Sequence, residues 1–238
     1  MTPSSPSNSN AYAVLTGDLV DSSRLDAADL DHQRQRLYFA VNEVRNLDSS
    51  LIIGDLQFFR GDSWQLALRK PGLFLRMAVL LRAALLSELP RGDTRIAVGL
   101  GPAEFLDEVS VSKSVGEAFT RSGLALDEMG RRRSVEVSAD PAVLAAVDWL
   151  PPLLGLVSAI VGRWAEKQAR VAMFALHPRE MQQKDIARRV GLTQQGVSKL
   201  VVNAELSSIL AAIDYVEQYD WGGLLSRFPP STMPFRAQ

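Results

Sequence analysis

The pattern of hydrophobic and polar positions divides the first part of the chain into alternating strands and helices. Short apolar runs predict strands, whereas longer segments with apolar residues at helical spacing predict helices. The predicted strands are 11–16, 94–100 and 133–138. The predicted helices are 30–47, 72–89 and 114–129. Two further strand-like runs lie within 51–68, and the Gly61-Asp62 pair between them predicts a hairpin. This order of elements is typical of an α+β fold, an antiparallel or mixed sheet with helices on one face.

After residue 150 the pattern becomes helical. Pro151-Pro152 marks a boundary, and the helices expected beyond it lie at 153–164, 166–176 and 203–219, with two shorter ones inside 183–201. We therefore expect three parts. They are a disordered tail (1–10), an α+β domain (11–150) and an all-α domain (151–238).

The segment 183–201 predicts a helix-turn-helix. Ile186, Ala187 and Val190 share one face of a short helix. Gly191 permits the left-handed turn that ends it, and Thr193 is a favourable first cap for the next helix. In such units the start of the second helix reaches base edges in the major groove of DNA. A helical hairpin that only packs or dimerises is the alternative.

Candidate DNA-binding residues follow from this geometry. Gln pairs with adenine through two hydrogen bonds, and Lys contacts guanine or phosphate. The candidates are Arg188, Thr193, Gln194, Gln195, Ser198 and Lys199.

Charge and composition narrow the function classes. The formal net charge is −1, but residues 1–150 carry 16 Lys and Arg against 20 Asp and Glu, and residues 151–238 carry 10 against 7. The local excess of positive charge around the helix-turn-helix favours a nucleic-acid partner, although a solvated helical surface gives the same bias.

The absence of cysteine excludes disulfides and thiol chemistry. The first ten residues lack the features of a signal peptide. The most apolar segment, 73–89, is interrupted by Arg76, Arg82 and Glu88, which argues against a membrane span. We therefore expect a cytoplasmic protein with no membrane partner.

Two acidic residues suggest a metal site. Asp18 follows the first predicted strand, and Asp62 lies in the hairpin turn. If these strands are neighbours the two carboxylates meet, and a divalent cation would relieve their repulsion. Such a metal would clamp a triphosphate for phosphoryl transfer. The alternative is that Asp18 and Asp21 only form hydrogen bonds within turns.

These residues resemble a known family. The N-terminal pattern is similar to the class III nucleotidyl cyclase domain, which implies a ferredoxin-like, cyclase-like fold. The resemblance implies that Asp18, Asp62 and the Leu19 carbonyl bind Mg²⁺ or Mn²⁺, and that the segment Val20, Asp21, Ser22 and Ser23 holds the triphosphate. It further implies that Arg121 stabilises phosphate charge, while Glu117 stands where the family has a catalytic Asn.

A second resemblance covers nearly the whole chain. The residues that carry it are Thr16–Ser22, Arg60-Gly61-Asp62, Gly116–Phe119 with Arg121, Trp164–Gln168 and Gln183–Leu200. Together they resemble the SatD family of bacterial proteins, which implies a cyclase-like domain fused to a DNA-binding domain.

Three hypotheses follow. The first is a DNA-binding regulator whose N-terminal domain senses a nucleotide or a metal ion. The second is a metal-dependent nucleotidyl cyclase or nucleotidyltransferase. The third is a protein whose N-terminal domain only dimerises, and a homodimer would suit the two-fold half-sites of helix-turn-helix proteins.

Overall fold

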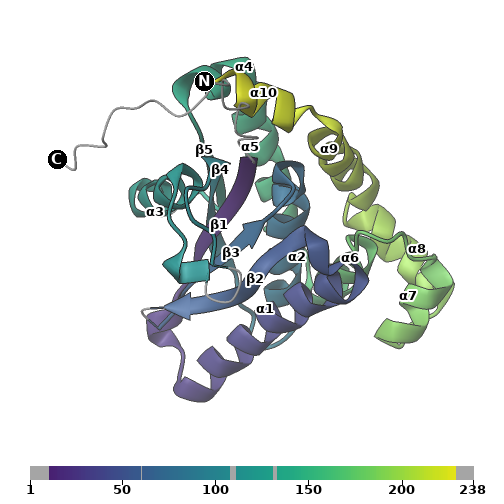
Figure 1. Cartoon of the computed structure of the whole chain (residues 1–238). Coiled ribbons are helices and arrows are strands. Elements are labelled where there is room, and N and C mark those ends of the chain that lie inside the picture. The colour runs from purple at the N-terminus through teal and green to yellow at the C-terminus, as the bar shows by residue number, and fades with distance from the viewer. Residues whose placement is uncertain (1–10, 60, 108–110, 131–132, 229–238) are drawn as a thin grey trace, which may run out of the picture.

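The fold is built on one five-stranded mixed sheet with the strand order β2-β3-β1-β4-β5. The computed structural model describes residues 11–59, 61–107, 111–130 and 133–228 (Figure 1). The predicted tail (1–10) and Arg60 lie outside them. The strands are β1 (Ala11–Leu19), β2 (Ile52–Phe59), β3 (Ser63–Leu68), β4 (Thr94–Pro102) and β5 (Val135–Ser138).

β1 is the central strand because it pairs antiparallel with both β3 and β4. β2 pairs antiparallel with β3, and β5 runs parallel to β4. Strands β2-β3-β1-β4, with one helix after β1 and one after β3, form the split βαβ arrangement of a ferredoxin-like fold. The predicted α+β class is therefore confirmed.

Helices follow the strands in the order that the sequence predicts, with small shifts at their ends. In the first part of the chain they are α1 (Ala27–Leu47), α2 (Phe74–Leu86), α3 (Glu117–Glu128) and α4 (Pro141–Ala146). In the second part they are α5 (Leu150–Val161), α6 (Glu166–Ala175), α7 (Gln183–Val190), α8 (Gln194–Asn203), α9 (Leu206–Gln218) and α10 (Trp221–Arg227).

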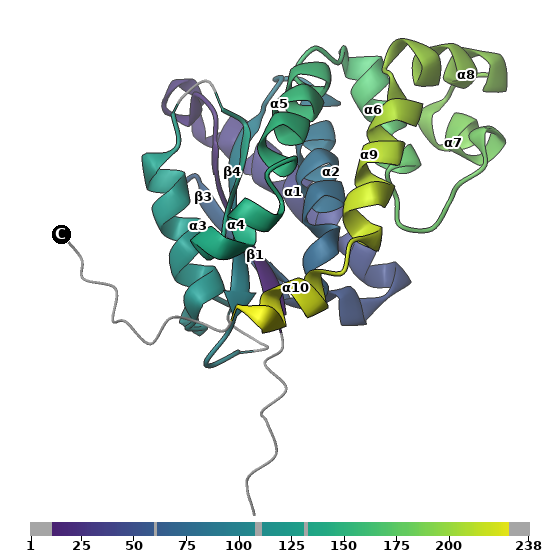
Figure 2. The ribbon, with the colours of Figure 1, turned by 90° about the horizontal axis from the view of Figure 1, so that it is seen from above.

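Helices cover both faces of the sheet, which corrects the expectation of helices on one face. The large apolar core lies between one face and the helices α1, α2 and α5, while α3 packs on the other face (Figure 2). Gly99 of β4 explains how α3 approaches so closely, because a Cβ there would lie 1.9 Å from the carbonyl oxygen of Ala118. Successive side chains of β4 point to opposite faces of the sheet, so they enter the two cores alternately.

The C-terminal helices share the large core with the sheet domain. α6 packs against α2, and the cluster that begins at β1 continues to Ile186 and Val197 of the helix-turn-helix. Arg76 of α2 strengthens this junction through ion pairs with Glu217 and Asp214 of α9, at 2.6 and 3.0 Å. The boundary at residue 150 stays a prediction.

Two helices differ from those that the sequence predicts. Pro151 and Pro152 lie in the first turn of α5 instead of before it, because the first turn needs no backbone N–H donors. α10 lies in a segment where no helix was predicted. Among the described residues no single helix is long and apolar enough to cross a membrane, and α8 with α9 reaches that length only across a 67° bend.

Candidate functional site

Asp18 and Asp62 lie at the same end of neighbouring strands. Asp18 pairs in register with Ser63, and the Leu19 N–H donates to the Asp62 carbonyl at 3.2 Å. This end is held by Thr94, whose hydroxyl donates to the Asp18 carbonyl at 2.7 Å and accepts from the buried Trp64 indole at 3.0 Å. The structure thus brings the two predicted acids together.

Arg95 of β4 binds the carboxylate of Asp18. Its Nε donates to Asp18 Oδ1 at 3.0 Å, its Nη2 pairs with Oδ2, and its Nη1 donates to the Met129 carbonyl at 3.0 Å. Hydrogen bonding to Asp18 is the main cause that raises the pKa of Arg95. The charges of Asp18 and Asp62 act in the same direction, against partial burial. The protein therefore supplies a cation of its own beside the two acids.

These residues do not fit a divalent metal ion as they are arranged. Both oxygens of Asp18 are engaged by Arg95, and Asp62 accepts a hydrogen bond from the Ser22 hydroxyl. Within the described part of the chain no group of three or more His, Asp or Glu side chains is suited to a metal. The expectation that Asp18, Asp62 and Leu19 bind Mg²⁺ or Mn²⁺ stays a prediction, and such binding would require Asp18 to exchange Arg95 for the metal ion.

The predicted phosphate loop is folded against the neighbouring strand end. The Val20 N–H donates to the Asp93 carbonyl at 2.9 Å, so it does not point toward a ligand. Asp21 has a left-handed backbone, with φ 55°, and begins a 3-10 turn over Ser22–Arg24. Ser23 and Asp21 are exposed, so this short turn is open to solvent.

A pocket of about 220 Å³ adjoins this loop. Gln33 lines it from α1 and is 2% exposed, and its Oε1 has no hydrogen-bond partner among the described residues. Buried polar atoms without a partner are rare in proteins. Arg24 and Arg91 line the same pocket and add positive charge. Asp21 and Asp93 line it as well, and Arg24 pairs with Asp21 at 3.7 Å, so the pocket presents charges of both signs beside the unpartnered carboxamide.

Glu117 and Arg121 lie away from the acid pair within one chain. α3 runs antiparallel to β4, so Glu117 lies beside Gly101 whereas Arg95 reaches the other end of the helix at Met129. Arg121 is buried, and its guanidinium donates to Glu117 at 2.6 Å and to the Ala139 carbonyl at 2.8 Å. The ion pair lies within α3, and the hydrogen bond to Ala139 ties the helix to the residue that follows β5.

The helix-turn-helix has the predicted local geometry. Gly191 ends α7 with φ 69°, and the Thr193 side chain caps α8 by accepting from the Gly196 N–H at 3.1 Å. Val197 is fully buried between the helices, as the apolar stripe requires. The turn and cap therefore place the first residues of α8 at the surface.

Four of the six predicted DNA-binding residues line one open hollow of about 450 Å³ at the start of α8. Its lining residues are Gln183, Thr193, Gln194, Gln195 and Ser198. Lys199 is exposed next to them, and Arg188 is exposed on α7 and pairs with Asp185 at 2.9 Å. The N-terminus of a helix carries partial positive charge and free N–H groups, so this hollow suits a phosphate or another acceptor.

Comparisons with known proteins place the chain in no family. No protein-family model matches it, and no curated protein matches it. Among solved structures it is similar to the active GGEEF domain of a diguanylate cyclase from Vibrio cholerae. That likeness has 11% identity and a TM-score of 0.36, over 55% of this chain and 83% of that chain. The resemblance to the SatD family therefore rests on the sequence motifs alone.

Sequence reasoning missed two residues of this site. The sequence indicates Arg95 only as part of a predicted strand. Its ion pair with Asp18 follows from the register between β1 and β4, which places the two residues opposite each other. Gln33 carried a signal in the sequence, because it continues the apolar stripe of α1 through Leu37 and Val41. A polar residue on such a stripe is buried, and a buried carboxamide needs a hydrogen-bond partner.

Proposed function

We propose that this protein is a DNA-binding regulator whose N-terminal sheet domain senses a nucleotide. The observation that carries the proposal is the exposed start of α8, where Gln194, Gln195, Ser198 and Lys199 follow a well-formed cap and turn. Residues at these positions of a second helix reach base edges when it lies in the major groove.

The side chains on this helix suit base recognition. Gln194 and Gln195 present carboxamides that pair with adenine through two hydrogen bonds. Lys184 and Lys199 are exposed and make no ion pair within the described residues, so both are available to phosphates or guanine. Arg189 in contrast is engaged by Glu43 at 2.8 Å, which keeps it out of the candidate surface.

The sensing half of the proposal rests on the pocket beside residues 20–25. Arg24 and Arg91 suit phosphate oxygens, and the unpartnered carboxamide of Gln33 suits the polar edge of a base. Because Arg95 already neutralises Asp18, we favour a sensor over a nucleotidyl cyclase, and the motifs shared with the SatD family agree with a fusion of this kind.

A homodimer is part of the proposal. Helix-turn-helix proteins commonly read two half-sites about 34 Å apart, one from each copy of a two-fold pair. A single α8 contacts too few bases for a selective site.

The test uses the full chain and fluorescence anisotropy on a 30-base-pair duplex that is first selected from random DNA. We expect binding at low salt. Lys199→Ala should weaken it about fivefold and lower the salt slope by about one, since one phosphate contact is lost. Repeating the titration with ATP or GTP should shift the affinity for the wild type, and less for Gln33→Leu.

Lys113→Ala is the matched control, because Lys113 is also exposed but lies in the sheet domain. Its titration should overlay the wild type. Absence of DNA binding at low salt, or equal losses in both lysine variants, would contradict the proposal. DNA binding that neither nucleotide alters would support the DNA-binding half of the proposal and contradict the nucleotide-sensing half.

A further inference from the structure

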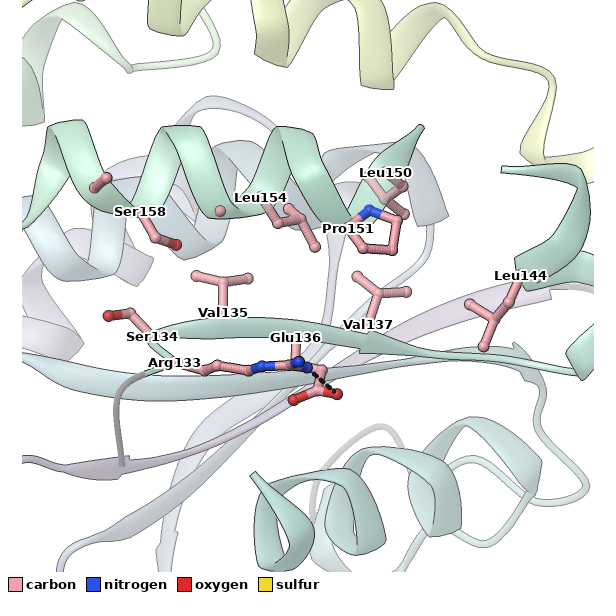
Figure 3. Close-up of a pocket in the computed structure, with 12 residues that line it drawn as sticks. Arg133, Ser134, Val135, Glu136, Val137, Leu144, Leu150, Pro151, Leu154 and Ser158 are labelled. Carbon is pink, nitrogen blue, oxygen red and sulfur yellow. Dashed lines mark hydrogen bonds and ion pairs between the residues drawn. The ribbon is translucent and has the colours of Figure 1, made fainter. Parts of the chain in front are cut away.

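A second cavity, remote from the helix-turn-helix, lies between the edge strand β5 and helix α5. Its volume is about 590 Å³, which lies in the range of small-molecule sites. Figure 3 shows Val135 and Val137 of β5 pointing toward Leu150 and Leu154 of α5, with Leu144 at one end. The walls are therefore mainly aliphatic.

The small residues of α5 explain why side chains leave this space unfilled. Pro151, Leu154, Gly155, Ser158 and Ala159 line it, and their spacing places them on one stripe of the helix. Gly155 and Ala159 are too small to reach β5 from that stripe. A Cβ added at Gly155 would meet no atom within 4 Å. Pro151, Gly155 and Ala159 are exposed, so the cavity is open to solvent along this stripe, where small residues leave it uncovered.

One polar atom faces this apolar space without a partner. The Ser158 hydroxyl is buried and makes no hydrogen bond among the described residues, and Figure 3 shows it pointing from α5 toward β5. The Ser158 backbone, in contrast, is tied down, since its carbonyl accepts from Arg82 at 3.5 Å. A buried hydroxyl without a partner is destabilising, and a ligand with a hydrogen-bonding group would remove that cost.

The charges at the cavity decide the kind of ligand. Arg133 and Glu136 pair with each other at 3.0 Å, and Figure 3 shows this pair on the side of β5 turned away from Leu150 and Leu154, so neither charge points into the cavity. A charged ligand would find no complementary group, and its desolvation would go uncompensated.

We propose that the cavity between α5 and β5 binds a small, uncharged, mainly apolar molecule whose single hydroxyl or amide group hydrogen-bonds to Ser158. This site is independent of the proposed DNA and nucleotide functions, because it shares no residue with either.

The experiment measures binding of three probes to the full chain by saturation-transfer NMR. The probes are 4-ethylphenol, ethylbenzene and 4-ethylbenzoate, which share a ring and differ in the polar group. We expect 4-ethylphenol to bind about fivefold tighter than ethylbenzene, the value of one hydrogen bond, and 4-ethylbenzoate to bind most weakly.

Two variants locate the site. A Cβ at Gly155 meets no atom and leucine favours the helix, so Gly155→Leu should fold; with its side chain in the cavity, it should lose at least about tenfold in affinity for 4-ethylphenol. Ser158→Val should abolish the preference for the phenol over the hydrocarbon. Leu156→Gln is the control, because Leu156 is 67% exposed and does not line the cavity.

Three binding results would overturn the proposal. They are failure of all three probes to bind, equal losses in Gly155→Leu and Leu156→Gln, or a phenol preference that survives Ser158→Val. A wild type that sediments as a dimer while Gly155→Leu is a monomer would also overturn it, since the groove would then be covered by a second copy.

Discussion

At the scale of single residues, Arg95 decides the chemistry at the end of β1. Its side chain is 24% exposed and that of Asp18 22%, so the ion pair is only partly screened by water. Without the guanidinium, Asp18 and Asp62 would be two carboxylates at one strand end, an arrangement that favours a divalent cation. Arg95 therefore lowers the charge of this strand end from −2 to −1, and its removal would leave a candidate metal site.

Replacement of Arg95 should expose that latent site. We expect Arg95→Ala to bind Mn²⁺ in isothermal titration calorimetry while the wild type gives no heat of binding, because only the variant lacks an internal cation. The variant should also lose about 2 kcal/mol of stability without metal, as expected for a broken, partly buried ion pair.

Two controls accompany this prediction. Arg95→Lys keeps the positive charge and should bind no Mn²⁺. The double variant Asp18→Asn with Arg95→Ala should lose the gained affinity. Equal Mn²⁺ binding by the wild type and Arg95→Ala would show that the guanidinium does not block the acids.

At the scale of elements, the turn between α7 and α8 sets the direction of the recognition helix. Gly191 adopts φ 69°, which residues with a Cβ rarely adopt, and a Cβ there would clash with nothing. Its importance is therefore conformational and not steric. Thr193 follows two residues later and fixes the first turn of α8.

Two glycine substitutions should change stability in opposite directions. Gly191→Ala should destabilise the protein by about 1 kcal/mol, because alanine is strained in the left-handed region. Gly123→Ala lies inside α3, where the added Cβ also meets no atom, and should stabilise the protein by about 0.5 kcal/mol through helix propensity. Urea unfolding measures both values, and changes of the same sign would contradict this account of the turn.

At the scale of the whole molecule, one apolar core joins the sheet domain to the helix-turn-helix. α2 is the shared element, since it packs on the sheet and on α6, and Arg76 ties it to α9. The candidate DNA surface lies at the far side of the molecule from α3 (Figures 1 and 2). A signal from the sheet domain to α8 would therefore pass through α2 and α6.

We expect the chain to unfold in a single transition. Tryptophan fluorescence, which includes Trp64 in the sheet and Trp164 beside α6, should follow the same urea curve as circular dichroism. Glu217→Ala should lower stability by about 2 kcal/mol, because the buried Arg76 then keeps only the more exposed Asp214 as an ion-pair partner among the described residues.

Glu128→Ala is the control for this junction. Glu128 is exposed and makes no ion pair within the described residues, so its removal should change stability by less than about 0.5 kcal/mol. Two separate transitions would contradict the shared core and support two independent domains at 11–150 and 151–238.

The sequence by itself determined the local features of this protein. The Gly-Asp hairpin, the left-handed end of α7 and the cap at Thr193 depend on residues a few positions apart, so their chemistry is readable along the chain. The order of strands and helices followed for the same reason, because hydrophobic periodicity reports which face of an element is buried.

Only the tertiary structure decided how distant residues meet. Asp18 and Arg95 are 77 positions apart, and their ion pair depends on the register between β1 and β4, which no local pattern specifies. The second layer formed by α3 required the close approach at Gly99, and the cavity under α5 required a helix with small residues to lie on β5. Contacts of this kind depend on how elements pack, whereas periodicity reports only which side of each element is apolar.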